Sequence, residues 1–403
     1  MKFLIIVQDL RITGTSEGIV SRSFLGKLRS VFPNAYIEVL YLKNHDNEDD
    51  LNLLPIDSIR DFHINRTIPF FTKWINKIYW RLFHESLNEK KIQERYATVM
   101  ATADFEKFDH IFIRSSGLDY ETILAAKKLP VLKNAIINFH DPFPVFWDTG
   151  SRKKLTAIEL FRLKNMWEIV QQAKVCITPA LLLSEDLEHL YGSEKKFYTL
   201  PHQYDKKVFN LSSTDKVRQK NKPVTISYHG AIQLGRNIDI VLDAYQELIA
   251  NSIFHKENTE FVLRLRGSQN QRLKNKYQET ANIIILDTLD FANSCNEQSN
   301  ETDILIILEN SSPHSNILGG KAPFLASLHK PILIIAPNRS EMRRIVSDNQ
   351  FIADCRNKEE IREKLKNLID KRIANPASQF PFGDYFEEQN FKESLLRILE
   401  VAK

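Results

Sequence analysis

Short apolar runs alternate with helix-like segments along almost the whole chain, and this alternation limits the possible folds more than any other feature. In the first half the apolar runs occupy residues 2–8 (KFLIIVQ), 36–42 (YIEVLYL), 110–116 (HIFIRSS), 134–141 (NAIINFHD), 174–179 and 196–202. Strands that alternate with helices form parallel sheets covered by helices. Because the runs are apolar throughout, rather than at every second residue, we expect both faces of each strand to be buried.

A second series of the same kind follows a polar stretch. The alternation resumes with apolar runs at residues 224–230 (VTISYHG), 260–267, 282–286, 303–309 and 331–337. We therefore predict an α/β fold of two doubly wound, Rossmann-like domains that face a central cleft, where the ligand is expected. The expected segments are an N-terminal domain at 1–205, a linker at 206–222, a second domain at 223–383, and a C-terminal helix at 384–403 that can pack back on the first domain.

Charge and cysteine content exclude several classes of protein. The 55 basic and 51 acidic residues leave a net charge of only +4, which does not favour a nucleic-acid partner. The three cysteines are far apart and form no C-x-x-C pair, so we expect a cytoplasmic protein without a disulfide framework or a metal site. The first residues resemble a strand more than a signal peptide, and no stretch of eighteen apolar residues is present.

The loop between the apolar runs 303–309 and 331–337 contains a candidate phosphate site. It includes Gly319, Gly320 and Lys321, and Pro323 marks the first turn of a following helix. Adjacent glycines let a ligand approach the backbone, while a helix start and a lysine favour an anion. The alternative is that the glycine pair is an ordinary turn and that Lys321 is a solvated cation.

A second loop of the same domain has a similar composition. The run 224–230 ends at Gly230, and Arg236 follows just before an amphipathic helix. An arginine offers a forked donor, so Arg236 and Lys321 on neighbouring loops would bracket a diphosphate. Alternatively Arg236 is a surface residue, and Asn237 or Asp239 caps the helix without contacting a ligand.

These stretches, HGAIQLGRNIDIVLDAYQEL and DILIILENSS…GGKAPFLASLHKPILI, resemble the donor half of a family-4 glycosyltransferase with the GT-B fold. The resemblance implies that Gly230, Arg236, Lys321 and the loop before it face the diphosphate of a nucleotide sugar. It also implies that Glu309 approaches the transferred sugar as a catalytic residue. The family often carries a second glutamate, but the matching positions here hold Ile317 and Phe324. In its place Ser315 and Asn316 can supply hydrogen bonds to the donor.

The resemblance extends to the activity. It implies retention of the anomeric configuration, no cofactor besides the nucleotide sugar itself, and a saccharide or lipid-linked saccharide acceptor in surface polysaccharide biosynthesis. Two other functions stay open. The missing second glutamate suits a non-catalytic nucleotide-sugar-binding subunit with a decayed site, and a sugar-nucleotide epimerase with the same fold would need further carboxylates and histidines.

Two loops of the N-terminal domain are candidates for the acceptor side. The first loop contains Gly14, Ser16, Glu17 and Gly18, and its spacing is not that of a dinucleotide-binding motif, so an ordinary turn is the alternative. The pair His140–Asp141 ends an apolar run. His140 can bind a sugar hydroxyl or move a proton with Asp141, and the alternative is a packed histidine before an Asp-Pro turn.

Residues 66–91 form an aromatic, apolar segment with interspersed lysines and arginines. A helix of this composition can lie in a membrane interface. It can equally pack on the first domain with its cations directed outward. Peripheral contact with the inner face of a membrane is therefore one of two expectations for this segment.

Overall fold

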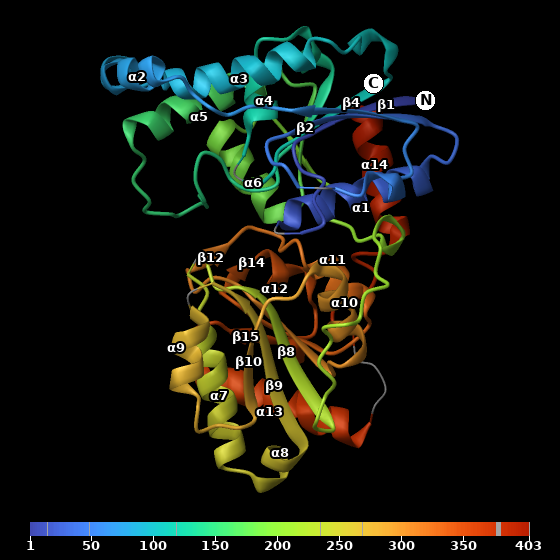
Figure 1. Ribbon diagram of the computed structural model, residues 1–403, viewed down its shortest axis with the longest axis vertical. Helices are drawn as coiled ribbons and strands as arrows, with labels where there is room; N and C mark the ends of the chain where they lie inside the picture. Colours follow the sequence, from blue (N-terminus) through green and yellow to red (C-terminus); the bar gives the residue numbers. More distant parts are fainter. Residues whose placement is uncertain are drawn as a thin grey trace. The chain divides into compact units, whose positions relative to one another are not determined.

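The protein is described here from a computed structural model that covers residues 1–13, 15–47, 49–117, 119–233, 235–267, 269–375 and 380–402 (Figure 1). The chain divides into two compact units. The first unit contains Met1–Val208 together with the segment from Glu387 to the C-terminus, and the second contains Phe209–Phe386.

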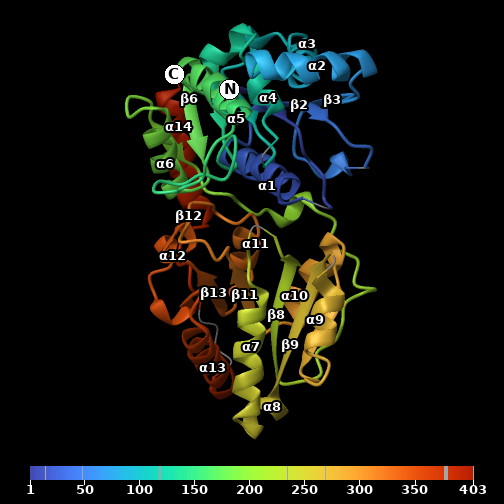
Figure 2. The same cartoon turned by 90° about the vertical axis from the view of Figure 1, so that its left-hand side faces the viewer.

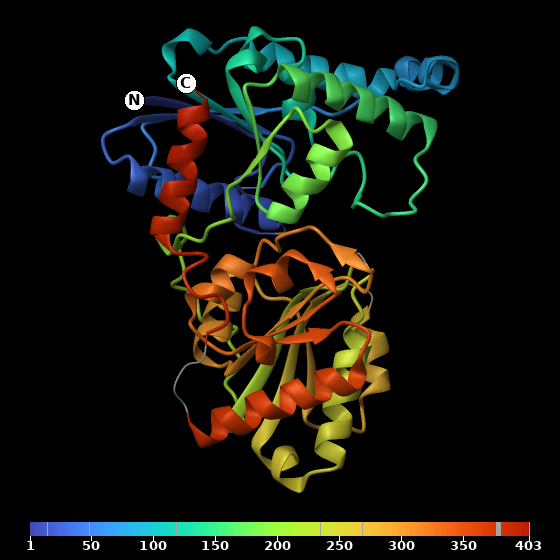
Figure 3. The ribbon, with the colours of Figure 1, turned by 180° about the vertical axis from the view of Figure 1, so that it is seen from behind.

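The first unit is a parallel sheet of seven strands in the order β3-β2-β1-β4-β5-β6-β7. Its strands are β1 (Lys2–Val7), β2 (Tyr36–Lys43), β3 (Ser58–His63), β4 (His110–Arg114), β5 (Ala135–Asn138), β6 (Val175–Thr178) and β7 (Phe197–Thr199). Its helices are α1 (Ser16–Val31), α2 (Phe70–Phe83), α3 (Leu87–Met100), α4 (Glu121–Ala126), α5 (Ala157–Gln172), α6 (Leu181–Tyr191) and α14 (Glu388–Val401). Figure 3 shows α14, in red, against this unit, where Phe391 meets Phe24 of α1 with ring centroids 6.4 Å apart.

The second unit is a parallel sheet of six strands in the order β10-β9-β8-β11-β13-β15. Its strands are β8 (Val224–Ala231), β9 (Thr259–Arg266), β10 (Ile283–Asp287), β11 (Ile304–Leu308), β13 (Ile332–Ala336) and β15 (Ile352–Asp354), and the short strands β12 (His314–Ser315) and β14 (Arg339–Ser340) pair separately. Its helices are α7 (Ile238–Ala250), α8 (Ile253–Asn258), α9 (Gln269–Lys276), α10 (Phe291–Asn300), α11 (Ala322–Ser327), α12 (Glu341–Ile345) and α13 (Lys358–Ala374).

The central strands are buried on both faces, as their continuous apolar composition predicts. Every residue of β4, β5, β6 and β13 is buried, so helices must cover both sides of these sheets. In the second unit α7 and α13 pack against each other (Figure 2), joined by ion pairs of Glu247 with Lys358 and Arg362. The predicted fold class, two doubly wound α/β domains, is confirmed.

Most of the polar stretch 206–222 groups with the second unit. The short turn Lys206–Val208 belongs to the first unit, and residues 209–222 belong to the second. Arg218 forms an ion pair with Glu260 at 2.8 Å, and Lys220 pairs with Asp303 at 3.1 Å. Ion pairs of this kind explain why a segment without apolar periodicity still has a defined path.

Gly18 lets the first loop lie directly on helix α1. A Cβ atom at this position would lie 2.1 Å from the carbonyl oxygen of Arg11. We therefore expect Gly18→Ala to lower the free energy of unfolding by about 1–3 kcal/mol, as overpacking does in other proteins. Urea denaturation measures this loss, and Ser30→Ala on the exposed side of the same helix is the matched control. A Gly18→Ala variant as stable as the control would contradict the packing described here.

Candidate functional site

The strand order reverses once in each sheet, and most of the predicted site residues follow the strands at these points. In the second unit β8 and β11 are neighbours although β9 and β10 lie between them in sequence. Crossovers therefore leave this point in opposite directions, which opens a crevice beyond the carboxyl ends of the two strands. Gly230 and Arg236 come from the end of β8, whereas Glu309 and Lys321 follow β11.

Lys321 places its ammonium group directly over Gly230. A Cβ atom at Gly230 would lie 2.6 Å from the Lys321 Nζ, so a larger residue here would displace the ammonium group from this position. The Nζ donates a hydrogen bond to the carbonyl oxygen of His229 and lies 5.9 Å from the centre of the Tyr228 ring. The residue remains partly exposed, and its cationic end is turned back over the end of β8.

Arg236 lies close enough to Lys321 for the two charges to repel each other. Burial of the ammonium, with the nearby Arg236 guanidinium as a further cause, lowers the pKa of Lys321 to about 8. The Arg236 Nη1 donates to the carbonyl oxygen of Ala231 at 3.2 Å, and its buried Nε has no hydrogen-bond partner among the described residues. Within the same part of the chain, neither cation forms a salt bridge with a carboxylate. The structure thus brings together the two cations that the sequence placed on separate loops.

Glu309 is held by two serines on either side of it. Its side chain is buried, with Ser315 Oγ donating to Oε1 at 3.1 Å and Ser340 Oγ donating to Oε2. Burial raises the pKa of Glu309 to about 7, against the effect of these hydrogen bonds. Since Ser315 lies on β12 and Ser340 on β14, the carboxyl group ties both short strands to the end of β11. Nothing in the local sequence pointed to Ser340.

The other residues of the predicted donor loop differ in how closely their surroundings pack around them. Asn316 is buried, whereas no described atom lies within 4 Å of a Cβ atom placed at Gly319, so this position is open. The predicted helix begins at Ala322 and has only six residues, with Pro323 in its first turn as expected. Asn237 caps α7 through its side chain, 3.4 Å from the Ile240 nitrogen.

A shallow hollow lies farther along the same edge of this sheet and was not predicted from the sequence. It has a volume of about 440 Å³ and is lined by residues at the ends of β9 and β10 and on α9, namely Leu265, Arg266, Gly267, Asn270, Gln271, Lys274, Asp287 and Thr288. Its lining is mixed, with one lysine and one arginine beside an aspartate and two amides. Because β9 adjoins β8 in the sheet, the hollow opens on the same edge as Gly230.

In the first unit the strand order reverses between β1 and β4, and Asp9 organises the loop that follows β1. The Asp9 carboxylate pairs with Arg11 at 2.6 Å and accepts a hydrogen bond from the Thr15 hydroxyl at 2.8 Å. The Thr15 side chain therefore stabilises the loop and does not cap α1, although the residue occupies the N-cap position of this helix. Gly14 lies outside the described residues, and Ser16 is exposed.

Glu17 and Asp141 form a pair of neighbouring carboxyl groups beside Gly117. A Cβ atom at Gly117 would lie 2.9 Å from Glu17 Oε1 and 3.5 Å from Asp141 Oδ2. Burial and the charge of Glu17 raise the pKa of Asp141 to about 7, and burial likewise raises the pKa of Glu17. One carboxyl group near neutral pH can therefore hold a proton while the other is ionised, a combination suited to acid–base chemistry.

His140 is directed away from this carboxyl pair. Its buried Nε2 lies 3.0 Å from Arg114 Nη2 and 3.1 Å from Asn138 Oδ1, and its ring packs edge-on against His202. Burial, with Arg114 and His202 as further causes, brings the pKa of His140 well below its usual value. His140 and Asp141 thus have different neighbours, Arg114 for the ring and Glu17 for the carboxyl group.

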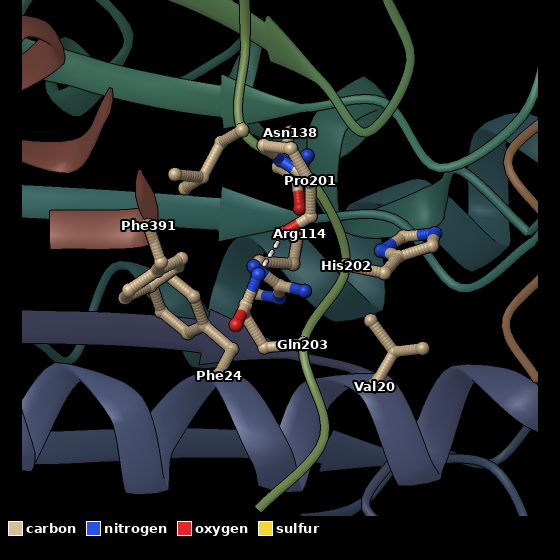
Figure 4. Close-up of a pocket in the computed structure, with 9 residues that line it drawn as sticks. Val20, Phe24, Arg114, Asn138, Pro201, His202, Gln203 and Phe391 are labelled. Carbon is tan, nitrogen blue, oxygen red and sulfur yellow. Dashed lines mark hydrogen bonds between the residues drawn. The ribbon is translucent and has the colours of Figure 1, made fainter. Parts of the chain in front are cut away.

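Arg114 lines a small cavity beside His140 that the sequence did not reveal (Figure 4). The cavity of about 10 Å³ is large enough for one water molecule, and its lining residues are Val20, Phe24, Arg114, Asn138, Leu200, Pro201, His202, Gln203 and Phe391. The guanidinium is buried 4.3 Å from the centre of the Phe24 ring, and burial lowers its pKa to about 9. Neither its Nε nor Gln203 Oε1 has a hydrogen-bond partner within the described segments.

Among the described residues, no group of three or more histidine, cysteine, aspartate or glutamate side chains is placed to hold a metal ion. In the segments that the structure covers, no helix combines the length and apolar character needed to cross a bilayer.

The fold is similar to that of several solved structures, whereas neither protein-family models nor curated proteins match the sequence. Sucrose-phosphate synthase from Thermosynechococcus elongatus matches 100% of this chain and 96% of its own, with a TM-score of 0.59 and 11% identity. UDP-GlcNAc 2-epimerase from Neisseria meningitidis, bound to UDP-GlcNAc, matches 98% of this chain and 100% of its own at a TM-score of 0.55 and 15% identity. A glycosyltransferase from Rickettsia africae matches 100% of this chain and 95% of its own, with a TM-score of 0.55 and 13% identity. At such identities the likeness shows the fold, which consists of two Rossmann-like domains as in GT-B glycosyltransferases.

The carboxyl pair predicts a specific pH dependence of stability. In the folded protein Asp141 keeps its proton up to about pH 7, whereas an unfolded aspartate loses it near its ordinary value of 3.8. Its stabilising contribution is therefore complete below pH 3.8 and is lost as pH rises to 7. Compared with the wild type, we expect Asp141→Asn to gain about 2–3 kcal/mol more in the free energy of unfolding at pH 8 than at pH 5.

Urea denaturation at pH 5 and pH 8 measures this difference. Glu17→Gln is the matched variant, because removing the neighbouring charge lowers the pKa of Asp141 and reduces the difference without deleting Asp141 itself. Equal effects of Asp141→Asn at both pH values would show that this carboxyl group titrates normally.

Proposed function

We propose that the protein is a glycosyltransferase that uses a nucleoside-diphosphate sugar. The observation that carries the proposal is the convergence of Arg236 and Lys321 beyond β8 and β11. Neither cation forms a salt bridge with a described carboxylate, although the charge of Arg236 reaches the buried Glu309 and lowers its pKa against the effect of burial. Two close cations that repel each other are stabilised by a ligand with adjacent negative charges. A diphosphate fits this requirement, since the forked guanidinium and the ammonium can each take one phosphate group.

In this proposal, the charges also promote the reaction. When the bond between the anomeric carbon and the diphosphate oxygen breaks, negative charge accumulates on the leaving nucleoside diphosphate. Arg236 and Lys321 stabilise this charge without reorganisation, because β8, β11 and their loops already hold them in place. Gly230 leaves space for the Lys321 ammonium, and Gly319 offers open backbone to the phosphates. The neighbouring hollow at β9 and β10 is large enough to take the nucleoside.

The acceptor in this proposal is a saccharide or a lipid-linked saccharide. Its hydroxyl group is bound by Glu17 and Asp141, and as the new bond to the anomeric carbon forms, the hydroxyl proton passes to the ionised carboxylate of the pair. Glu309 positions the donor loop through Ser315 and Ser340, and His140 supports the acceptor side through Arg114. Retention of configuration, a part in polysaccharide biosynthesis and a cytoplasmic location at the inner face of a membrane complete the proposal.

A sugar-nucleotide epimerase is the second candidate. The carboxyl pair Glu17–Asp141, with one pKa near 7, favours it because epimerisation needs a group that removes a proton and another that returns it. The fold also occurs in a structure described as UDP-GlcNAc 2-epimerase.

The two candidates are separated by incubating the protein with UDP-GlcNAc without an acceptor and following the sugar by NMR. Conversion at the 2-position without release of UDP indicates the epimerase, whereas transfer to an added saccharide indicates the glycosyltransferase.

Binding of nucleotide sugars tests the site directly. We expect at least one of UDP-glucose, UDP-GlcNAc and GDP-mannose to bind, and Arg236→Ala or Lys321→Ala to weaken binding about 10–100-fold, the effect of losing a hydrogen bond to a charged group. Gly230→Ala is expected to weaken it as well by displacing the Lys321 ammonium. Isothermal titration calorimetry measures the affinities, with Lys366→Ala on an exposed helix as the control. Affinities unaffected by all three site variants would place the ligand elsewhere. If nucleotide sugars bind but none is hydrolysed, transferred or epimerised, the decayed binding subunit is the better description.

The affinity should also depend on pH through Lys321. Its pKa is about 8 without ligand, so the ammonium is charged below pH 8 and increasingly neutral above it. The diphosphate of UDP-glucose keeps its charge throughout this range, and its affinity is therefore expected to fall as pH rises from 7 to 9.5. Lys321→Arg keeps its charge at these pH values. If the affinity of Lys321→Arg stays constant with pH while that of the wild type falls, the pH dependence is due to Lys321. If both affinities fall in parallel, Lys321 is not the cause.

A further inference from the structure

Helix α2 has its polar residues turned toward the protein. Its neighbour in the described part of the chain is α3, at the periphery of the first unit (Figure 1). On the side facing α3, Asn76 Oδ1 accepts a hydrogen bond from the Leu87 nitrogen at 2.7 Å. On the same side, the Tyr79 hydroxyl donates to Glu85 at 3.1 Å. All fourteen residues of α2 are described and none of them is buried, so the helix adds no side chain to the core.

The opposite side of α2 carries large apolar side chains in contact with solvent. Six large apolar side chains of α2 are more than half exposed, and five of them lie on this side, namely Phe70 (76%), Phe71 (78%), Trp74 (57%), Ile78 (53%) and Leu82 (68%), whereas Phe83 (57%) at the end of the helix does not. At 100° per residue these five occupy one sector of the helix, opposite the sector of Thr72, Asn76 and Tyr79. Single exposed apolar residues are ordinary on protein surfaces, but a continuous set of this kind marks an interaction surface.

The charges on α2 indicate what this surface binds. Lys73, Lys77 and Arg81 recur every four residues and are all exposed, so they form a row along one edge of the apolar sector. The helix contains no aspartate or glutamate. A second copy of the chain would bring the same cations and no carboxylate to the contact. An anionic surface with an apolar interior matches both the row of cations and the apolar sector.

We propose that α2 binds the surface of a bilayer containing anionic phospholipids. In this arrangement the helix lies in the plane of the interface with Phe70, Phe71, Trp74, Ile78 and Leu82 among the acyl chains. The three cations contact lipid phosphates, as in other interfacial helices. The fourteen residues are too short to span the bilayer and are suited to one face of it. The inference rests on the proposed function only in that the membrane would supply a lipid-linked acceptor.

Vesicle cosedimentation of the full chain tests this proposal. We expect binding to vesicles of equal parts phosphatidylcholine and phosphatidylglycerol, at least tenfold weaker binding to phosphatidylcholine alone, and a decrease between 0.1 and 0.5 M salt. The fluorescence of Trp74 should shift to shorter wavelength as its ring leaves water. Binding that is equal on neutral and anionic vesicles, or no binding to either, would overturn the proposal.

Two variants separate the apolar and charged contributions. F71S/W74S/I78S is expected to lose at least tenfold in binding, and K73E/K77E/R81E to lose the preference for anionic lipid. Because the replaced side chains are exposed, unchanged melting temperatures would exclude unfolding as the cause. Ile253→Ser on α8, where the side chain is 76% exposed, is the matched control and should bind as the wild type.

The same variants distinguish this proposal from the proposed function. F71S/W74S/I78S should retain the wild-type affinity for nucleotide sugars, so failure of nucleotide binding in the wild type would affect only the catalytic proposal. If light scattering shows a dimer that this triple variant converts to a monomer, and the wild type does not bind vesicles, the surface is a contact between copies and the lipid proposal is wrong.

Discussion

Burial of both faces of each parallel sheet determines where polar chemistry can lie in this protein. Strands such as β5, β6 and β13 are buried along their whole length, so a charged group within them would lose its hydration without a partner. Charged groups within strands accordingly have partners, as Glu260 and Arg264 of β9 do in ion pairs with Arg218 and Glu297. Most of the candidate site residues lie instead at strand ends and in the loops that follow, and the reversal of strand order keeps two of these loops apart in each unit. The loops after β1 and β4, and after β8 and β11, are the positions that the sheets leave open.

Each unit places a pair of like charges near such a position, and the two pairs have opposite signs. Glu17 and Asp141 lie near the ends of β1 and β5, whereas Arg236 and Lys321 follow β8 and β11. In both pairs, burial and a like-charged neighbour disfavour the ionised state of one member, the carboxylate of Asp141 and the ammonium of Lys321. Such pairs destabilise the ligand-free fold and are relieved by a ligand, as functional sites often require. In the proposed function, a diphosphate would relieve the repulsion in the cationic pair, and a transferred proton would relieve it in the acidic pair.

The sequence predicted the strands and the meeting of Arg236 with Lys321, because apolar runs define strands and parallel strands share one carboxyl edge. It could not predict which neighbours a side chain would find there. His140 and Asp141 are consecutive in sequence, yet one contacts Arg114 and the other lies near Glu17. The role of Ser340 depends on the pairing of β12 with β14, which are only two residues long and have no detectable pattern. Arg114 ends an apolar strand, and its burial beside Phe24 follows from packing across the sheet.

The segment at 66–91 shows a different limit of sequence reasoning. An amphipathic pattern states that one side of a helix is apolar, but it does not state whether that side faces the protein. In α2 the hydrogen bonds of Asn76 and Tyr79 resolve this, because they fix the polar side against α3 and the turn before it. If the apolar side were buried instead, the Asn76 amide and the Tyr79 hydroxyl would be exposed to water, and Lys73 and Lys77 would lie near the first unit. Two local hydrogen bonds therefore decide that the apolar surface of this helix is available to a partner outside the chain.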